Sequence, residues 1–225
     1  MAYPSTPIPS SNHLAADFWL QQLPTLQSMF LNQDGDFLDA RERPEIMSLL
    51  PSLQGKRVLD LAAGIGRFTG EFAKAAKRVT SVDIAPQFIE QSKLQNHRFS
   101  NIDYLCKDAR ELDFPDESFD LVFAHSLLMY LEEREVVELA AKIVRWMSKD
   151  GYFFLRESCS PSTKKVEASG IEGHYIAYHR SLRFYHQLFD RQLALMKTGE
   201  IQVFIETLAN PFKCYWLWKR APLLA

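Results

Sequence analysis

The stretch KRVLDLAAGIGRFTGEFAKAA, residues 56–76, decides the fold. Its apolar run at 58–61 predicts a buried strand, and the small residues 62–66 predict a tight turn. The segment RFTGEFAKAA that follows has the character of a helix. A strand, a glycine-containing turn and a helix in this order begin a βαβ unit, and ligands bind at such turns.

The same alternation continues along the chain. Further strands are predicted at 79–84, 102–109, 119–126 and 152–158, with helices at 86–96 and 133–148. A helix is expected at 183–195, followed by two strands at 201–208 and 213–220. Only a few residues separate these two strands, so they must run antiparallel. We therefore expect an α/β fold: a doubly wound, Rossmann-like sheet of seven mostly parallel strands with an antiparallel C-terminal hairpin.

The N-terminal region differs in composition from this core. Residues 1–16 are rich in Pro and Ser and predict a flexible tail. Residues 17–53 have apolar positions at helical spacing and predict short helices that cap the sheet. No linker divides the remainder, so we expect a single domain over 17–225.

Composition excludes several classes of protein. The 225 residues carry a net charge of −2, which argues against a nucleic-acid or anionic-membrane binder. No apolar run reaches the roughly 18 residues of a membrane helix, and the N-terminus lacks the features of a signal peptide. Three cysteines at spacings that match no zinc site or disulfide framework favour the cytoplasm. We expect no metal and no partner beyond small molecules, and a monomer or weak dimer.

Polar residues follow four of the predicted strands, at the edge of the sheet where ligands of open α/β folds bind. The first of these sites reads DxxxGxG at 60–66, and it lacks the third glycine of the dinucleotide-binding GxGxxG. It resembles the S-adenosylmethionine-dependent methyltransferases of class I, with acids at three successive strand ends. The alternative for each acid is a helix N-cap. The resemblance implies S-adenosylmethionine as cofactor and as its ligands Asp60, Ala62 (in place of a Gly), Gly64, Gly66, Asp83, Ile84, Asp108, Ala109 and His125.

A closer resemblance covers about residues 28–220. Residues 41–73 resemble the start of the first methyltransferase domain of plant and nematode phosphoethanolamine N-methyltransferases. Four shorter segments follow in register: SLLMYL (126–131), RESC (156–159), YHRSLRFY (178–185) and CYWLWKR (214–220). The resemblance implies methylation of the nitrogen of phosphoethanolamine, or of its methylated forms, toward phosphocholine. The plant enzymes have two such domains in tandem, and this chain resembles one.

The acceptor requires two kinds of group. Its amine must lose a proton before it can attack, and its phosphate needs Arg, Lys or Tyr donors. The segment 159–187, expected as a lid, contains such residues. From the resemblance we expect catalytic roles for Tyr130, Tyr178 and His179, and acceptor binding by Ser126, Tyr175, Arg180, Arg183 and Tyr185. Structural roles remain open for Tyr130, as a packing residue, and for the arginines, as solvated side chains.

The sequence departs from the family at two places near the acceptor. Ser126 stands where the relatives have Trp or Asp, and YHRSLRFY replaces HYRxPRFY. Methylation of another small amine, or of an O or S acceptor, therefore remains an alternative. A non-catalytic subunit that binds S-adenosylmethionine is a third possibility. The missing third glycine makes a nicotinamide oxidoreductase the least favoured.

Overall fold

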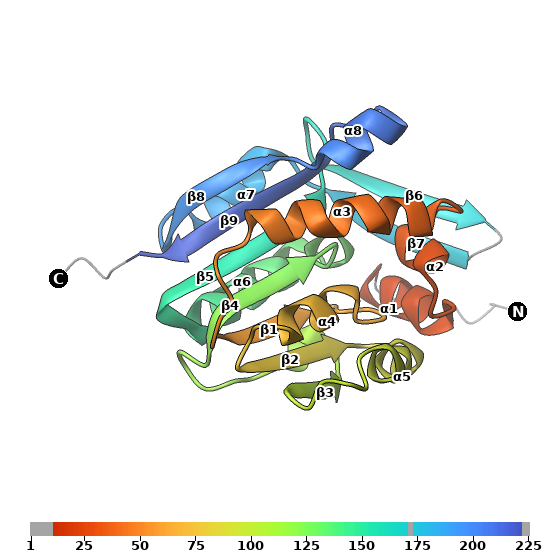
Figure 1. Ribbon diagram of the computed structural model, residues 1–225. Coiled ribbons are helices and arrows are strands. Elements are labelled where there is room, and N and C mark those ends of the chain that lie inside the picture. The colour runs from red at the N-terminus through yellow and green to blue at the C-terminus, as the bar shows by residue number, and fades with distance from the viewer. Residues whose placement is uncertain (1–10, 171–172, 222–225) are drawn as a thin grey trace, which may run out of the picture.

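The computed structural model describes residues 11–170 and 173–221 and contains one seven-stranded sheet (Figure 1). The strand order is β3-β2-β1-β4-β5-β9-β8, and all neighbours are parallel except at β9, which is antiparallel to both β5 and β8. This confirms the predicted fold class. The strands are β1 (Arg57–Leu61), β2 (Arg78–Asp83), β3 (Ile102–Cys106), β4 (Phe119–His125), β5 (Met147–Ser158), β8 (Leu193–Glu200) and β9 (Lys213–Arg220).

Helices cover both faces of this sheet. On one face α6 and α7 pack against the core, and on the other α3, α4 and α8 do so. The helices are α1 (Ser11–Gln21), α2 (Leu26–Phe30), α3 (Gly35–Leu49), α4 (Arg67–Ala73), α5 (Pro86–Gln95), α6 (Glu133–Trp146), α7 (Leu182–Phe189) and α8 (Gln202–Leu208), with 3₁₀ turns η1 (Ala109–Glu111) and η2 (Leu128–Tyr130). Because α1 already begins at Ser11, the tail predicted for 1–16 is partly helical, and its first ten residues lie outside the described ones.

The prediction was wrong for the penultimate strand. Residues 201–208 form mainly the helix α8, and the strand β8 lies at 193–200, where the end of a helix was expected. Ile201, Val203 and Phe204 turn into the core from the start of α8. Most side chains of β8 are exposed, as is common for an edge strand, so the apolar alternation that reveals a half-buried strand is absent.

A second, two-stranded sheet lies above the carboxyl ends of the main strands (Figure 1). It pairs β6 (Lys164–Gly170) with β7 (Gly173–His179) in the region expected as an irregular polar lid. Phe18 of α1 packs against Tyr175 of β7, with ring centroids 4.7 Å apart. The helix α1 and this small sheet thus cover the end of the fold where ligands of open α/β sheets bind.

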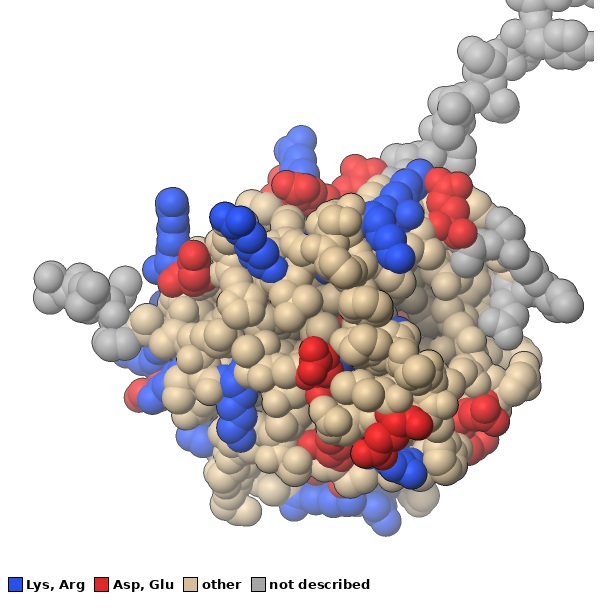
Figure 2. All heavy atoms as spheres, turned by 90° about the horizontal axis from the view of Figure 1, so that it is seen from above, with Lys and Arg blue, Asp and Glu red and all other residues tan. Residues whose placement is uncertain are grey.

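The molecular surface carries charges of both signs. Figure 2 shows Lys and Arg side chains interspersed with Asp and Glu on the face seen from above, with much uncharged surface between them. In the described part of the chain, none of the helices combines the length and apolar character needed to cross a bilayer.

Candidate active site

One cavity of about 400 Å³ lies at the carboxyl ends of the parallel strands. The strand order reverses between β1 and β4, and this switch point is where an open α/β sheet opens a crevice. Trp19 of α1, Met29 and Phe30 of α2, and Tyr175 of β7 contribute to the opposite wall. The cavity has two parts: a first half at the ends of β1, β2 and β3, and a second half at the ends of β4, β5 and β9.

The turn after β1 shapes the first half. Ala62, Gly64 and Gly66 all have positive φ, at 54°, 57° and 78°. Ala62 lines the cavity in a left-handed conformation that favours glycine, as expected at a position where the family has one. The two glycines do not line it: a Cβ at Gly66 would lie 2.0 Å from the Ser92 hydroxyl, so that glycine allows α4 to pack closely on α5.

Two predicted acids, Asp60 and Asp83, lie buried in the wall of the first half. Asp60 accepts a hydrogen bond from the Thr69 hydroxyl at 2.6 Å, and burial raises its pKa to about 7. Asp83 accepts from the backbone N–H groups of Gly64 and Ala85 at 2.8 and 2.9 Å, and burial raises its pKa to about 6. Neither carboxyl forms an ion pair with a Lys or Arg of the described residues. They therefore suit a ligand that brings its own donors and positive charge.

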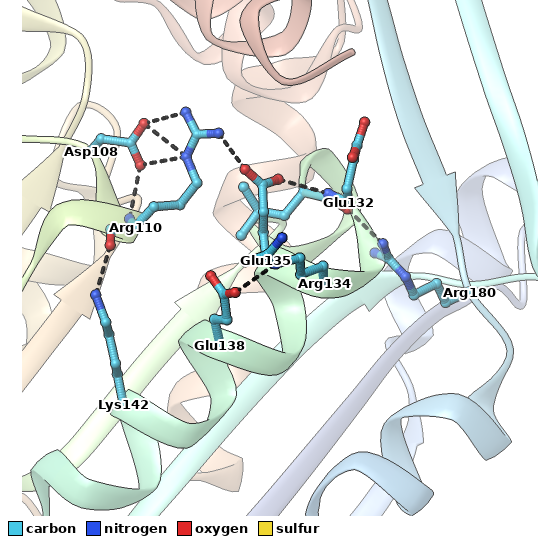
Figure 3. Close-up of polar contacts among 9 residues, drawn as sticks. Asp108, Arg110, Glu132, Arg134, Glu135, Glu138, Lys142 and Arg180 are labelled. Carbon is cyan, nitrogen blue, oxygen red and sulfur yellow. Dashed lines mark hydrogen bonds and ion pairs between the residues drawn. The ribbon is translucent and has the colours of Figure 1, made fainter. Parts of the chain in front are cut away.

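The third acid, Asp108, has a different environment. Its carboxylate caps η1 by accepting from the Arg110 N–H at 2.8 Å, and it also binds the Arg110 guanidinium at 2.6 Å. Arg110 then reaches Glu135 of α6 at 2.6 Å, so the three side chains form a row (Figure 3). Hydrogen bonds from Arg110 lower the pKa of Asp108 against the effect of burial. The capping role raised as an alternative thus applies to Asp108, although it also lines the cavity with Ile84 and Ala109.

These residues fit S-adenosylmethionine. Asp83 at the end of β2 offers carboxylate oxygens to ribose hydroxyls, and Ile84, Phe88 and Ala109 offer an apolar surface for a base. The carboxyl of Asp60 suits the ammonium of a methionine moiety, because a cation near this group would offset its burial. The fit rests on two buried acids that line one cavity and form no ion pair with a Lys or Arg of the described residues.

A buried charge cluster, which the sequence prediction missed, forms part of the cavity wall. Glu42 of α3 is fully buried and binds Arg67 of α4, Arg156 of β5 at 2.8 Å, and the His125 imidazole at 3.0 Å. Burial lowers the pKa of His125 to about 4, so its ring is neutral and donates to Glu42. His125, Arg67 and Arg156 line the cavity. One signal was available: Glu42 lies on the same helical face as the buried Leu38 and Ile46.

The second half brings together Ser126, Tyr130, Tyr175 and His179. Ser126 follows β4 with a φ of 54°, and its hydroxyl accepts from Arg156 at 2.8 Å. Tyr130 of η2 packs edge-on against Trp19, with centroids 5.5 Å apart, and burial raises its pKa above the usual value. Burial and the nearby Lys213 and Lys164 lower the pKa of His179 to about 4, so its imidazole is unprotonated at neutral pH.

Lys213, at the start of β9, is the most informative residue that the sequence prediction missed. It lines the cavity and donates to the Ser158 hydroxyl at 2.6 Å. Burial and the neighbouring Arg156 lower its pKa to about 8, so it is mainly protonated at pH 7. It forms no ion pair with a described carboxylate, unlike Arg67 and Arg156, whose charges are opposed by Glu42. Nothing in the local sequence marks Lys213, because it enters the cavity through the pairing of β9 with β5.

The structure does not bring four of the residues predicted to act on the acceptor into the cavity. Tyr178 alternates with Tyr175 and His179 along β7 and therefore lies on the other face of the strand. Tyr185 is fully buried in the core against Trp216, with centroids 4.9 Å apart. Arg183 is exposed on α7. Arg180 is buried and donates to backbone carbonyls of η2 and the residue after it. These positions correct the expected acceptor-binding roles, and the expected catalytic role of Tyr178.

Several known proteins have sequences similar to this chain. A methyltransferase-domain family model matches residues 59–155. The chain is 36% identical over 209 residues to a Triticum aestivum phosphoethanolamine N-methyltransferase, a match that covers 87% of this chain and 41% of the relative. Caenorhabditis elegans phosphoethanolamine N-methyltransferase 1 is 40% identical over 157 residues, covering 68% of this chain and 33% of the relative.

A solved structure is similar over nearly the whole chain. It is Haemonchus contortus phosphoethanolamine N-methyltransferase 1 in complex with phosphoethanolamine and S-adenosylhomocysteine. The TM-score is 0.81 at 32% sequence identity, and the match covers 97% of this chain and 52% of that one. This chain thus spans about two fifths to one half of these plant and Haemonchus relatives. It has the fold of the class I methyltransferases and is a homologue of the phosphoethanolamine N-methyltransferases.

Proposed function

We propose that this chain transfers methyl groups from S-adenosylmethionine to the nitrogen of phosphoethanolamine or its N-methylated forms, toward phosphocholine. The similarity to phosphoethanolamine N-methyltransferases of plants and nematodes supports the proposal. The observation that carries it is Lys213, a half-buried ammonium that lines the second half of the cavity and is ion-paired with no described carboxylate. An acceptor with an anionic group would supply the missing partner.

Lys213 and Ser158 form the proposed phosphate site. The Lys213 ammonium can donate to a phosphate oxygen, and the Ser158 hydroxyl beside it can turn to donate as well. Arg67 and Arg156 are less suited because Glu42 already binds both guanidinium groups. The proposed phosphate-binding residues thus lie on β5 and β9, and Arg180 and Arg183, which the sequence suggested for this role, are not among them.

The aromatic side chains of the second half suit the other end of the acceptor. Tyr130, Tyr175 and Trp19 lie close together, with Tyr130 and Tyr175 centroids 6.1 Å apart. Aromatic faces attract ammonium groups, including methylated ones. The Tyr130 oxygen can accept a hydrogen bond from the acceptor nitrogen and orient it toward the donor half of the cavity.

The amine must lose a proton, since an alkylammonium has a pKa of about 10.4. His179 is unprotonated and lines the same half of the cavity. The positive charge of Lys213 contributes to its low pKa, and a phosphate bound there would oppose that effect. Binding of the acceptor would therefore make His179 a stronger base when a proton has to be removed.

The cofactor, when bound, supplies an already activated methyl group. The chain's own task is to hold the acceptor nitrogen in line and to exclude water. We further propose that residues 159–187 and α1 cover the site, that residues 17–225 act as one domain, and that the reaction takes place in the cytoplasm.

The test is production of S-adenosylhomocysteine by the purified protein, with phosphoethanolamine and its mono- and dimethyl forms offered separately. We expect turnover with at least one of them and little with ethanolamine, which lacks the phosphate. Lys213→Ala should lower kcat/KM for the phosphobase about 100-fold, because a charge-assisted contact in a buried site is lost. The exposed Lys149→Ala is the matched control. Equal turnover of ethanolamine, or an active Lys213→Ala, would contradict the proposal.

A further inference from the structure

The turn that carries Tyr130 connects β4 to α6 and makes few regular backbone hydrogen bonds of its own. Its residues Leu127 to Leu131 include the short η2 and close with hydrogen bonds from Tyr130 N–H to Leu127 O and from Leu131 N–H to Leu128 O. A turn of this kind needs other groups to fix its position. Two buried side chains of opposite charge supply these contacts.

Glu157 of β5 holds the first side of the turn. Its carboxylate accepts from three successive backbone N–H groups: those of Leu127 at 3.0 Å, Leu128 at 2.7 Å and Met129 at 3.3 Å. The side chain is fully buried and does not line the cavity. Burial raises the pKa of Glu157 to about 7, while these N–H donors and the charges of Arg156 and Arg180 favour its carboxylate. Above that pH the group is mainly ionised, and hydrogen bonds to an ionised acceptor are stronger than neutral ones.

Arg180, which follows β7, holds the second side. Its guanidinium donates through Nη1 to Leu128 O at 2.7 Å and through Nη2 to Leu131 O at 2.5 Å. Arg180 is 2% exposed and does not line the cavity either. The planar fork of Arg donates to both carbonyls at once, which the single ammonium of Lys cannot do equally well.

A third contact fixes the chain just beyond the turn. Glu135 of α6 accepts from the Glu132 N–H at 2.9 Å and from Arg110 at 2.6 Å (Figure 3). In the same view Arg180 reaches toward this segment from the other side. The turn is therefore held by backbone contacts along its whole length, and the Tyr130 side chain is left to face the cavity.

We propose that Glu157 and Arg180 are positioning residues that clamp the turn and so fix Tyr130 against the acceptor. The role deepens the proposed function and rests on it, because it assigns Tyr130 to the acceptor. It also explains why Arg180 is buried away from the cavity. Neither residue contacts substrate, and each acts through the turn.

The first test measures the clamp without any substrate. In Glu157→Gln the amide offers one acceptor where the carboxylate offers two, and its NH₂ group faces backbone donors. At pH 8, where Glu157 is mainly ionised, hydrogen exchange of the amides of residues 127–129 should accelerate about tenfold or more in the variant, since charge-assisted bonds are lost. Exchange in β4 should stay as in the wild type. Arg180→Lys should produce the same local change while keeping the charge.

The second test measures the consequence for catalysis. Both variants should lower kcat for the phosphobase about 10- to 100-fold, because a small displacement of a positioned group has effects of this size. The Kd for S-adenosylhomocysteine should stay within about twofold, since the first half of the cavity is untouched. In a Tyr130→Phe background, Glu157→Gln should have a much smaller effect on kcat, because the group that it positions is already gone.

Two exposed residues of α6 provide matched controls. Arg134 and Glu138 pair only with each other at the surface (Figure 3), and Arg134→Ala and Glu138→Gln should change neither exchange in the turn nor kcat. Unchanged exchange in both clamp variants would overturn the clamp. Faster exchange with unchanged kcat, or full additivity with Tyr130→Phe, would overturn the positioning role. If the wild type methylates no phosphobase, the proposed function fails, while the exchange measurement still decides on the clamp.

Discussion

The two halves of the cavity are built in different ways. The first half comes from the ends of three neighbouring strands and from one turn, all within residues 60–109. The second half needs η2, the small sheet, β5 and β9, which are far apart in the sequence. The first half is thus encoded locally and the second half by tertiary pairing. The predictions below test whether the two halves also act independently.

The largest expected effect is a loss of cofactor affinity when Asp83 in the first half is replaced. Asp83→Ala removes a buried carboxylate that both lines the first half and accepts two backbone N–H groups. We expect the Kd for S-adenosylhomocysteine to rise about 10- to 100-fold. Isothermal titration calorimetry measures it, and the Kd of the acceptor phosphate, measured without cofactor, should not change. A loss of both affinities would show that the halves are coupled.

The second prediction concerns pH and the acceptor half. Lys213 has a pKa of about 8, so it is charged below that pH and loses its charge as the pH rises above it. Phosphocholine, the proposed product, is a suitable ligand because its nitrogen does not titrate and its phosphate has a pKa of about 6.

We expect the Kd of phosphocholine to be lowest between about pH 7 and 8 and to rise about tenfold by pH 9.5. Above its pKa, the charged fraction of Lys213 falls about tenfold with each further pH unit. Lys213→Arg should flatten the profile, because Arg stays charged throughout this range. A profile that is already flat in the wild type would remove Lys213 from phosphate binding.

The third prediction concerns the covering helix α1, whose Trp19 packs against Phe88 in the first half and against Tyr130 in the second. The Gln87 amide, next to Phe88 at the start of α5, donates to the carbonyls of Trp19, Leu20 and Gln22 at 3.0–3.2 Å. Gln87→Ala should raise the dissociation rate of S-adenosylhomocysteine a few-fold, about the effect of one or two neutral hydrogen bonds. Stopped-flow measurements test this, with the exposed Gln95→Ala of the same helix as control. An equal change in both variants would contradict the role of Gln87.

The smallest effect is expected at Ala62. Its φ of 54° is unfavourable for a residue with a Cβ, and Gly would relieve this at some expense in chain entropy. Ala62→Gly should therefore raise the free energy of unfolding by no more than about 1 kcal/mol, as measured by urea unfolding. Destabilisation would show that the Ala62 methyl group packs usefully in the cavity wall.

The same contrast explains what could be predicted from the sequence. The fold and the residues of the first half were accessible, because strand periodicity and the DxxxGxG spacing are local patterns. In the second half Tyr130 and His179 line the cavity, and their predicted catalytic roles stay predictions. The assignment of Arg180 was wrong because its guanidinium turns inward to carbonyls, which no spacing rule reveals.

Two further errors have a common physical cause. Lys213 reaches the cavity only because β9 inserts between β5 and β8, so its role depends on strand order. The wrong assignment of β8 and α8 over residues 193–208 also has a tertiary cause. An exposed edge strand carries little apolar pattern, and α8 buries only one side. In both cases packing with distant segments overrides the local signal.

The position of Glu42 has a consequence for how much of the chain can fold. Its carboxylate lies within the body of the protein, between two guanidinium groups from α4 and β5. A fragment beginning at β1 would leave Arg67 and Arg156 buried without their counter-charge, and breaking a buried pair in this way costs about 3–5 kcal/mol. That is a large share of the roughly 5–15 kcal/mol by which domains are stable. The strand-turn-helix unit at 56–76 is therefore a recognisable motif, but the unit of folding extends at least to the helix that precedes it.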